Sequence, residues 1–201
     1  PFYNFSPIAF KLHMKRLQNS CDALGISISI DTISDEINLL IKDSKLENGY
    51  VYYQISRGVD TLRSHMYEES LDEETFGYAV EHNFDSNTLK VSLCEDVRWQ
   101  RCDIKSTSLL GNVLSMNQAK KNGCSEVIMH KANLITEGGA SNIFFATDNC
   151  IYTPSLANNI LPGITRELLI EEIRNLGLNF EEGNYSVEEL LQIAKIMLDD
   201  Q

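Results

Sequence analysis

Residues 89–106 read LKVSLCEDVRWQRCDIKS, and this stretch decides the fold of the second half of the chain. Leu89, Val91 and Leu93 alternate with polar residues, which is the pattern of a half-buried β-strand. A dense mixture of charges follows around the only tryptophan, Trp99. Residues 98–105 are therefore a candidate functional segment, and a surface strand with salt bridges is the alternative.

Downstream, the sequence predicts one helix and three short strands. Helical periodicity covers 108–122, and a glycine follows it as a stop signal. Short strands are predicted at 126–130, 142–146 and 150–153. Asp148-Asn149 is a plausible hairpin turn between the last two.

Two further helices are predicted near the end of the chain. Gly163-Ile164-Thr165 opens the first, which ends before Gly177. Ser186 and Glu189, three residues apart, form a capping box ahead of the second. Helices and strands therefore alternate unevenly, which predicts a mixed fold of the α/β or α+β class.

Upstream, two amphipathic helices are predicted. Ser6-Pro7 is a good helix start, and apolar residues then recur at helical spacing until Gly25. A second helix is predicted from about Ser34 to just before Asn48-Gly49, a strong turn signal. Its apolar face would carry Ile37 and neighbouring residues.

Two strands and a linker complete the first half. Strands are predicted at 50–56, which is rich in aromatic and β-branched residues, and at about 76–80. The polar stretch EHNFDSN, residues 81–87, is the linker candidate. We therefore expect two domains, a smaller one over 1–81 and a larger one over 82–201.

Composition excludes several classes of function. The formal net charge of -12 repels phosphate backbones and anionic lipids, so neither a nucleic acid nor a membrane is an expected partner. No apolar run is long enough to cross a bilayer, and the chain does not open like a signal peptide, so we expect a cytoplasmic protein. The five cysteines show no metal-ligand spacing, which predicts reduced thiols and no metal site.

Three other short segments could carry chemistry. The turn at Gly163-Ile164-Thr165 offers free backbone N–H groups to an anion, although most helix starts bind nothing. Arg63 and His65 would point to the same side of an extended backbone and could clamp a carboxylate, or could be a solvated pair in a loop. The small residues of TEGGASN, 136–142, could admit a flat ligand or simply form a loop between strands.

Taken together, the order and spacing of these segments resemble the class IV pyridoxal-phosphate (PLP) aminotransferases, the group that contains D-amino acid and branched-chain aminotransferases. Residues 95–106, EDVRWQRCDIKS, look like the lysine motif of the D-amino acid enzymes. Residues 136–138 with Ser141-Asn142 look like the motif at the cofactor ring, and residues 161–166, LPGITR, resemble the phosphate-binding turn. The resemblance spans nearly the whole chain and implies a two-domain PLP-dependent fold.

The resemblance also implies roles for individual residues. Lys105 would form the Schiff base with PLP and shuttle the proton at the substrate's α carbon. Glu137 would pair with the pyridine nitrogen of the cofactor and keep it protonated. The remaining cofactor-binding residues would be Ile164, Thr165 and Arg16 at the phosphate and Leu161 against the ring face.

The substrates implied are an amino acid and a 2-oxo acid. Arg63 and His65 fall where D-amino acid aminotransferases place their carboxylate trap, which favours a D-amino acid such as D-alanine over the alternatives, a branched-chain L-amino acid aminotransferase or an aminodeoxychorismate lyase. The resemblance also implies a homodimer. The family's first strands and its later threonine-rich loop have no counterpart here, so we expect a truncated chain, and a catalytically silent fragment is the alternative of another class.

Overall fold

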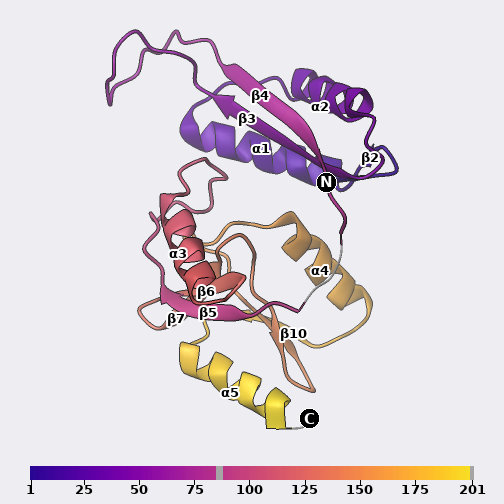
Figure 1. Cartoon of the computed structure of the whole chain (residues 1–201), viewed down its shortest axis with the longest axis vertical. Coiled ribbons are helices and arrows are strands. Elements are labelled where there is room, and N and C mark those ends of the chain that lie inside the picture. Colours follow the sequence, from indigo (N-terminus) through magenta and orange to yellow (C-terminus); the bar gives the residue numbers. More distant parts are fainter. Residues whose placement is uncertain (85–87, 200–201) are drawn as a thin grey trace. The chain divides into compact units, whose positions relative to one another are not determined.

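The computed structural model describes residues 1–84 and 88–199, with side chains up to Ile193. The chain divides into two compact units, Pro1–Ser86 and Asn87–Gln201, and each has its own sheets and helices (Figure 1). The mixture of helices and strands in both units is the mixed α/β architecture that the sequence predicts.

The first unit contains a four-stranded antiparallel sheet. Its order is β2-β1-β3-β4, and its strands are β1 (Phe2–Tyr3), β2 (Ser6–Pro7), β3 (Gly49–Ser56) and β4 (Glu74–Glu81). The long strands β3 and β4 pair along their full length, from Gly49 opposite Glu81 to Ser56 opposite Glu74. The strands predicted at 50–56 and 76–80 are thus confirmed.

Two helices, α1 (Phe10–Leu24) and α2 (Ile30–Ser44), belong to this unit. Ile33, Ile37 and Ile41 recur every four residues and form one buried face of α2, which contacts β3 and β4. They surround Phe2, which is fully buried, and this cluster is the core of the unit.

The predicted starts of both helices are wrong. Ser6-Pro7 does not open α1, because these residues pair with β1 as a short strand, and α1 begins after Ala9, whose φ is 49°. Helix α2 begins before Ser34, because Ser29 accepts a hydrogen bond from the backbone N–H of Thr32 and caps it. Both predicted ends are close to the observed ones.

The second unit contains a three-stranded sheet in the order β5-β6-β7. Its strands are β5 (Val91–Glu95), β6 (Glu126–Lys131) and β7 (Leu134–Gly138). Strands β5 and β6 are parallel and are joined through α3 (Leu110–Lys121), whereas β7 returns antiparallel to β6. Ala119 of α3 packs on Val127 and Met129 of β6 to form a second core.

A second three-stranded sheet of this unit has the order β10-β9-β8. Its strands are β8 (Phe145–Ala146), β9 (Ile151–Pro154) and β10 (Phe180–Gly183). Helix α4 (Ile164–Asn175) joins the parallel strands β9 and β10, and α5 (Val187–Asp199) follows. The predicted hairpin between β8 and β9 is confirmed, as is the capping box, in which Ser186 and Glu189 exchange hydrogen bonds.

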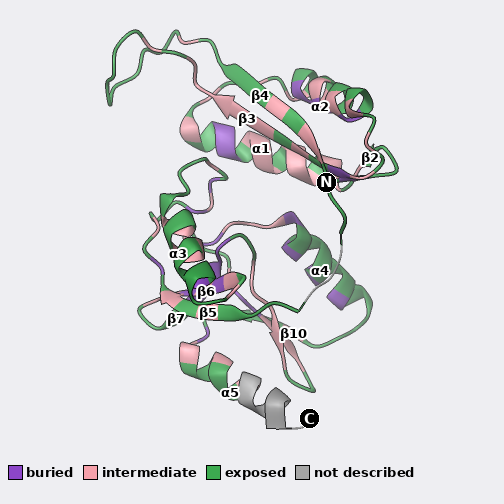
Figure 2. Cartoon of the chain, viewed as in Figure 1, coloured by how far each residue is buried: buried purple, intermediate pink, exposed green. Residues whose placement is uncertain are grey.

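Strands β7 and β10 are absent from the sequence-based prediction, and β8 is shorter than the stretch 142–146 predicted for it. Figure 2 shows that the buried residues of α4 recur along one side of the helix, and they include the charged residue Arg166. Within the described residues no helix has the length and apolarity needed to cross a membrane. All five cysteines are free thiols, and no three His, Cys, Asp or Glu side chains of the described part gather as metal ligands.

Candidate active site

The strand β7 brings a carboxylate into the interior of the second unit. Thr136 and Glu137 are both buried, although neighbouring residues of a regular strand point to opposite faces. The register of β7 against β6 shifts between Ile128 and His130, and only 5% of the surface of Glu137 is exposed. A buried carboxylate requires hydrogen-bond donors to compensate its lost hydration.

Three donors surround Glu137. Arg98 Nη1 donates to Oε1 over 2.5 Å, while Oε2 accepts from Asn142 Nδ2 (3.0 Å) and from the backbone N–H of Leu161 (3.1 Å). Asn142 Nδ2 also donates to the carbonyl of Leu161. The carboxylate is therefore fixed between the loop after β5, the loop after β7 and the turn before α4.

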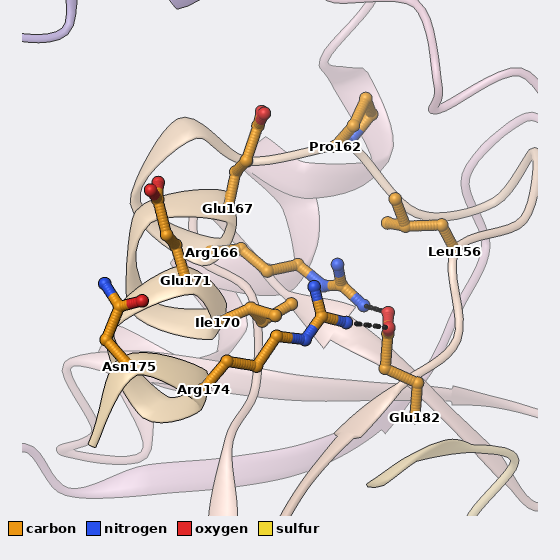
Figure 3. A pocket seen from close by; sticks show the side chains of 10 residues that line it. Leu156, Pro162, Arg166, Glu167, Ile170, Glu171, Arg174, Asn175 and Glu182 are labelled. Carbon is orange, nitrogen blue, oxygen red and sulfur yellow. Dashed lines mark hydrogen bonds and ion pairs between the residues drawn. The ribbon is translucent and has the colours of Figure 1, made fainter. Parts of the chain in front are cut away.

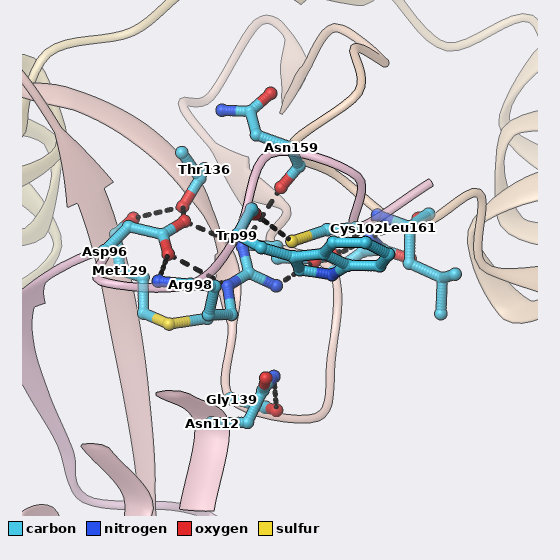
Figure 4. A network of polar contacts seen from close by, with 12 residues as sticks. Asp96, Arg98, Trp99, Cys102, Asn112, Met129, Thr136, Gly139, Asn159 and Leu161 are labelled. Atoms are coloured by element: carbon cyan, nitrogen blue, oxygen red, sulfur yellow. Dashed lines mark hydrogen bonds and ion pairs between the residues drawn. The ribbon is translucent and has the colours of Figure 1, made fainter. Parts of the chain in front are cut away.

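Arg98 is held from its other side by Asp96 (Figure 4). The guanidinium donates from Nε to Asp96 Oδ1 over 2.9 Å and from Nη2 to Oδ2 over 2.7 Å. Its Nη2 also donates to the carbonyl of Asn159 (3.0 Å). This two-pronged contact uses the planar geometry of arginine and leaves Nη1 directed at Glu137.

Asp96 is anchored in turn by a buried threonine. Thr136 Oγ1 lies 2.9 Å from Asp96 Oδ2 and 3.1 Å from the carbonyl of Met129, so its single proton can serve either acceptor. The backbone N–H of Asp96 donates to the carbonyl of His130. Asp96 is therefore tied to both β6 and β7.

The charges of this cluster do not balance. Two carboxylates, Asp96 and Glu137, share one guanidinium, so the buried group has a formal charge of about -1 when all three are ionised. Burial raises the pKa of Glu137, and the hydrogen bond and charge of Arg98 oppose that rise. Burial also acts to raise the pKa of Asp96, but its bonds to Arg98 and Thr136 outweigh this and hold the pKa below its usual value.

The loop that follows β7 is shaped by Glu126. Its Oε1 accepts from the backbone N–H of Gly139 (2.9 Å), and its Oε2 accepts from Ser141 Oγ (3.1 Å). A Cβ added at Gly139 would come within 2.4 Å of Met116 Sδ, and one added at Gly138 would come within 2.2 Å of Ser141 Oγ. The neighbouring side chains therefore leave little room for any side chain at these two glycines.

The segment that precedes Lys105 is anchored in the second unit. Cys102 and Ile104 are buried, and the backbone N–H of Asp103 donates to the carbonyl of Asn158 over 3.1 Å. Lys105 itself is exposed and follows directly. The segments 98–105 and 158–161 thus meet at two points, through Arg98 and through Asp103.

Ile164 and Thr165 are the first two residues of α4. Ile164 is buried and Thr165 is exposed, and their backbone N–H groups belong to the first turn, where a helix offers no internal acceptors. Leu161 is half-buried in the preceding turn, where its backbone already contacts Glu137 and Asn142.

The other candidate residues lie in the first unit. Arg16 is half-buried on α1, and burial lowers its pKa. Arg63 and His65 are both exposed in the loop that joins β3 to β4. The structure therefore gathers Glu137, Leu161 and the segment of Lys105 within the second unit, while the proposed carboxylate trap belongs to the first.

Sequence reasoning included Asp96, Arg98, Thr136 and Asn142 in its candidate motifs but assigned none of them a role in the site. The available signal was an acid and a base two residues apart, Asp96 and Arg98, directly after a predicted strand. That spacing allows the two side chains to meet. It does not reveal that the pair reaches Glu137, which is 39 residues away in the sequence.

A hollow of about 530 Å³ lies beside α4, on the side of Arg166 and Arg174 (Figure 3). Arg166 donates to the carbonyl of Pro154 (3.0 Å) and to Glu182 Oε1 (2.6 Å). Arg174 also points at Glu182, over 3.8 Å. Both guanidinium groups thus tie α4 to β10 through one acid.

Comparisons with known proteins identify the family of the chain. The sequence profile of the family described as amino-transferase class IV matches residues 1–198. The chain is 30% identical to a D-alanine aminotransferase of Listeria innocua over 204 residues, which cover 98% of this chain and 71% of that protein.

Solved structures show the same fold. One is a Legionella pneumophila protein assigned as a 4-amino-4-deoxychorismate lyase, with a TM-score of 0.84 and 23% identity over 94% of this chain and 72% of that chain. Another is the branched-chain amino acid aminotransferase of Escherichia coli, with a TM-score of 0.81 and 22% identity over 89% of this chain and 63% of that chain. The profile match and the D-alanine aminotransferase identity show that this chain belongs to the class IV aminotransferases, a family of PLP-dependent enzymes.

Proposed function

We propose that the chain is a transaminase that uses PLP to exchange an amino group between a D-amino acid of the D-alanine type and a 2-oxo acid such as 2-oxoglutarate. The observation that carries the proposal is the buried carboxylate of Glu137, fixed by three donors. The similarity to D-alanine aminotransferases supports the class of substrate.

The charge of the cluster fits the cofactor. Asp96, Arg98 and Glu137 leave a formal excess of one negative charge in the interior, and a protonated pyridine nitrogen facing Glu137 would neutralise it. Bound PLP supplies a sink for the electrons left at the substrate's α carbon when its proton departs. Glu137 would keep the ring nitrogen protonated.

The first turn of α4 fits the phosphate group. The backbone N–H groups of Ile164 and Thr165 and the positive end of the helix dipole favour an anion there. Arg16 would add a positive charge, and Leu161 would pack against the ring. The backbone of Leu161 is already tied to Glu137, which would couple the contact at the ring face to the contact at the ring nitrogen.

Lys105 would hold the cofactor through Nζ and would move the proton at the substrate's α carbon. The buried neighbours Cys102 and Ile104 fix its backbone, and Lys105 itself is exposed, as access by a substrate would require. Arg63 and His65 would bind the substrate carboxylate. In this arrangement the Asn87–Gln201 unit serves as the cofactor domain and the Pro1–Ser86 unit as the smaller domain.

Borohydride reduction tests the role of Lys105. The chain treated with PLP and then borohydride should gain the mass of one reduced cofactor, with the label on the peptide that contains Lys105. Lys105→Ala should gain none. Lys121→Ala, which removes an exposed lysine of α3, is the matched control and should label normally. Labelling of Lys105→Ala equal to that of the control would refute the assignment.

Comparing amino donors tests the substrate class. D-alanine should convert a 2-oxo acid to an amino acid faster than L-leucine does. A preference for L-leucine would indicate the branched-chain alternative, and release of pyruvate from aminodeoxychorismate would indicate the lyase. A catalytically silent fragment that cannot close the pocket would show no Schiff-base absorption beyond the band of free PLP when PLP is titrated into it.

The active form would be a homodimer in the cytoplasm. Leu109, Leu110, Val113 and Leu114 are exposed at and along the start of α3 and form an apolar surface suited to a second copy of the chain. Light scattering should give twice the mass of one chain. Leu110→Glu should lower that mass, whereas Leu39→Glu, at an exposed leucine of α2, should leave it unchanged.

A further inference from the structure

The buried cluster of Asp96, Arg98 and Glu137 contains more than the carboxylate proposed to contact the cofactor. Arg98 and Asp96 have 5% and 2% of their side-chain surfaces exposed, so both are withdrawn from water. Burying two such charges is costly unless each has a defined partner. The ion pair between Arg98 and Asp96, next to Glu137, therefore needs a functional explanation.

We propose that Arg98 is a positioning residue that keeps Glu137 ionised and aimed, and that Asp96 limits how strongly it does so. The link to the cofactor rests on the proposed function. The effect on Glu137 does not, because it follows from contacts within the chain.

The hydrogen bonds of Arg98 fix the orientation of its guanidinium. Asp96 accepts hydrogen bonds from Nε and Nη2 of Arg98, and the carbonyl of Asn159 accepts another from Nη2. These bonds fix the plane of the guanidinium. Asp96 is set in turn by Thr136 and by the backbone N–H of Arg98. Only Nη1 reaches Glu137, over 2.5 Å.

The two partners act on Glu137 with opposite signs. The charge of Arg98 lowers the pKa of Glu137, and the charge of Asp96 raises it. Cys102 also faces the cluster, but burial raises the pKa of its thiol and keeps it neutral. Asp103 lies in the same segment as Cys102, and its carboxylate is paired with Arg101 at the surface. The ionisation of Glu137 therefore depends on the balance between Arg98 and Asp96.

Two substitutions with opposite expected effects test this balance. Arg98→Met removes the positive charge and should raise the titration midpoint of Glu137 by about one to three pH units. Asp96→Asn keeps the shape of the side chain, removes the competing negative charge and should lower the midpoint. Loss of structure would disturb Glu137 in the same direction in both variants, so opposite signs separate an electrostatic role from a merely structural one.

Infrared spectroscopy of the full chain without cofactor provides the measurement. The carbonyl band of a protonated buried carboxyl is followed against pH, and the same titration with Glu137→Gln added to each variant identifies the band of Glu137. Shifts of opposite sign support the proposal. Shifts of the same sign, or midpoints unchanged from the parent chain, overturn it.

A conservative variant covers the case in which Arg98→Met fails to fold. Arg98→Lys keeps a positive charge but cannot contact Asp96 and Glu137 with a planar fork. Its midpoint should stay within about one pH unit of the parent, and the cofactor should bind more weakly because Glu137 is less well aimed. Two results for Arg98→Lys would contradict the proposal. One is a titration midpoint of Glu137 raised as far as is expected for Arg98→Met, and the other is cofactor binding equal to that of the parent chain.

The outcome is separable from that of the proposed function. The infrared titration uses no cofactor, and borohydride labelling at Lys105 does not measure Glu137. Labelling at Lys105 without opposite shifts of the Glu137 midpoint would support the transaminase proposal and refute the role of Arg98. Opposite shifts without labelling would support the role of Arg98 and refute the role of Lys105.

Discussion

Asn142 lies where any side chain at Gly163 would have to go, since a Cβ at Gly163 would come within 2.0 Å of Asn142 Oδ1. The same asparagine donates to Glu137 and to the carbonyl of Leu161. The contact between Gly163 and Asn142 therefore joins the turn before α4 to the loop that follows Glu137.

Gly163→Ala should destabilise the second unit by about 1–3 kcal/mol, because the new methyl group overpacks this contact. The backbone itself tolerates alanine, since φ is -69° at this position. On an Asn142→Ala background the same change should cost less than about 0.5 kcal/mol. Chemical denaturation of the parent chain, the two single variants and the double variant gives the coupling free energy between Gly163 and Asn142. If Gly163→Ala costs the same stability on both backgrounds, the contact with Asn142 is not the cause.

The pH dependence of stability should report the burial of Glu137. Because burial raises its folded pKa above the ordinary value of 4.5, Glu137 binds a proton more tightly in the folded chain without cofactor than in the unfolded chain. Its contribution to stability is then fully present below pH 4.5 and is lost as pH rises through the folded pKa.

The difference in unfolding free energy between the chain and its Glu137→Gln variant should therefore fall as pH increases above 4.5 and then level off. Denaturant unfolding at a series of pH values measures it. A difference that grows with pH would show that the folded pKa is depressed instead.

Thr136→Val should cost about 1–3 kcal/mol of stability, although valine has nearly the same shape. The hydroxyl is buried and serves Asp96 and the carbonyl of Met129, so its loss leaves polar groups short of a donor. Thr107→Val, at an exposed loop position, should change stability by less than about 0.5 kcal/mol. Similar melting temperatures for the two variants would contradict the anchoring role.

The elements that could be predicted from the sequence are those set by local chemistry. The capping box of Ser186 and Glu189 and the hairpin at Asp148-Asn149 are formed within a few residues and are found as predicted. Strand β7 was missed because Ile135, Thr136 and Glu137 are buried in succession, so the alternating pattern of a strand is absent. The helix start at Ser6-Pro7 failed because pairing with β1 overrides a local signal.

The same distinction applies to the site. The motif around Glu137 could be found from the order of its residues, and the structure places Glu137 next to Leu161. The contact of Arg98 with Glu137 could not be found, because the sequence gives no sign of which distant acid an arginine contacts. Only the folded chain shows that Arg98 bridges Asp96 to Glu137.

Arg63→Ala should impair substrate binding without impairing cofactor binding. If Arg63 binds the substrate carboxylate, its loss removes a charge-assisted hydrogen bond worth about 1.5–3 kcal/mol, which corresponds to a rise in KM for D-alanine of about tenfold or more. The exposed loop position makes a loss of stability unexpected. Arg174→Ala, at an exposed arginine of α4, is the matched control and should leave KM unchanged. Steady-state kinetics with D-alanine, together with the visible absorption of the bound cofactor, checks both parts. An unchanged KM in Arg63→Ala would remove this arginine from the site and leave the choice of a D-amino acid resting on the sequence similarity alone.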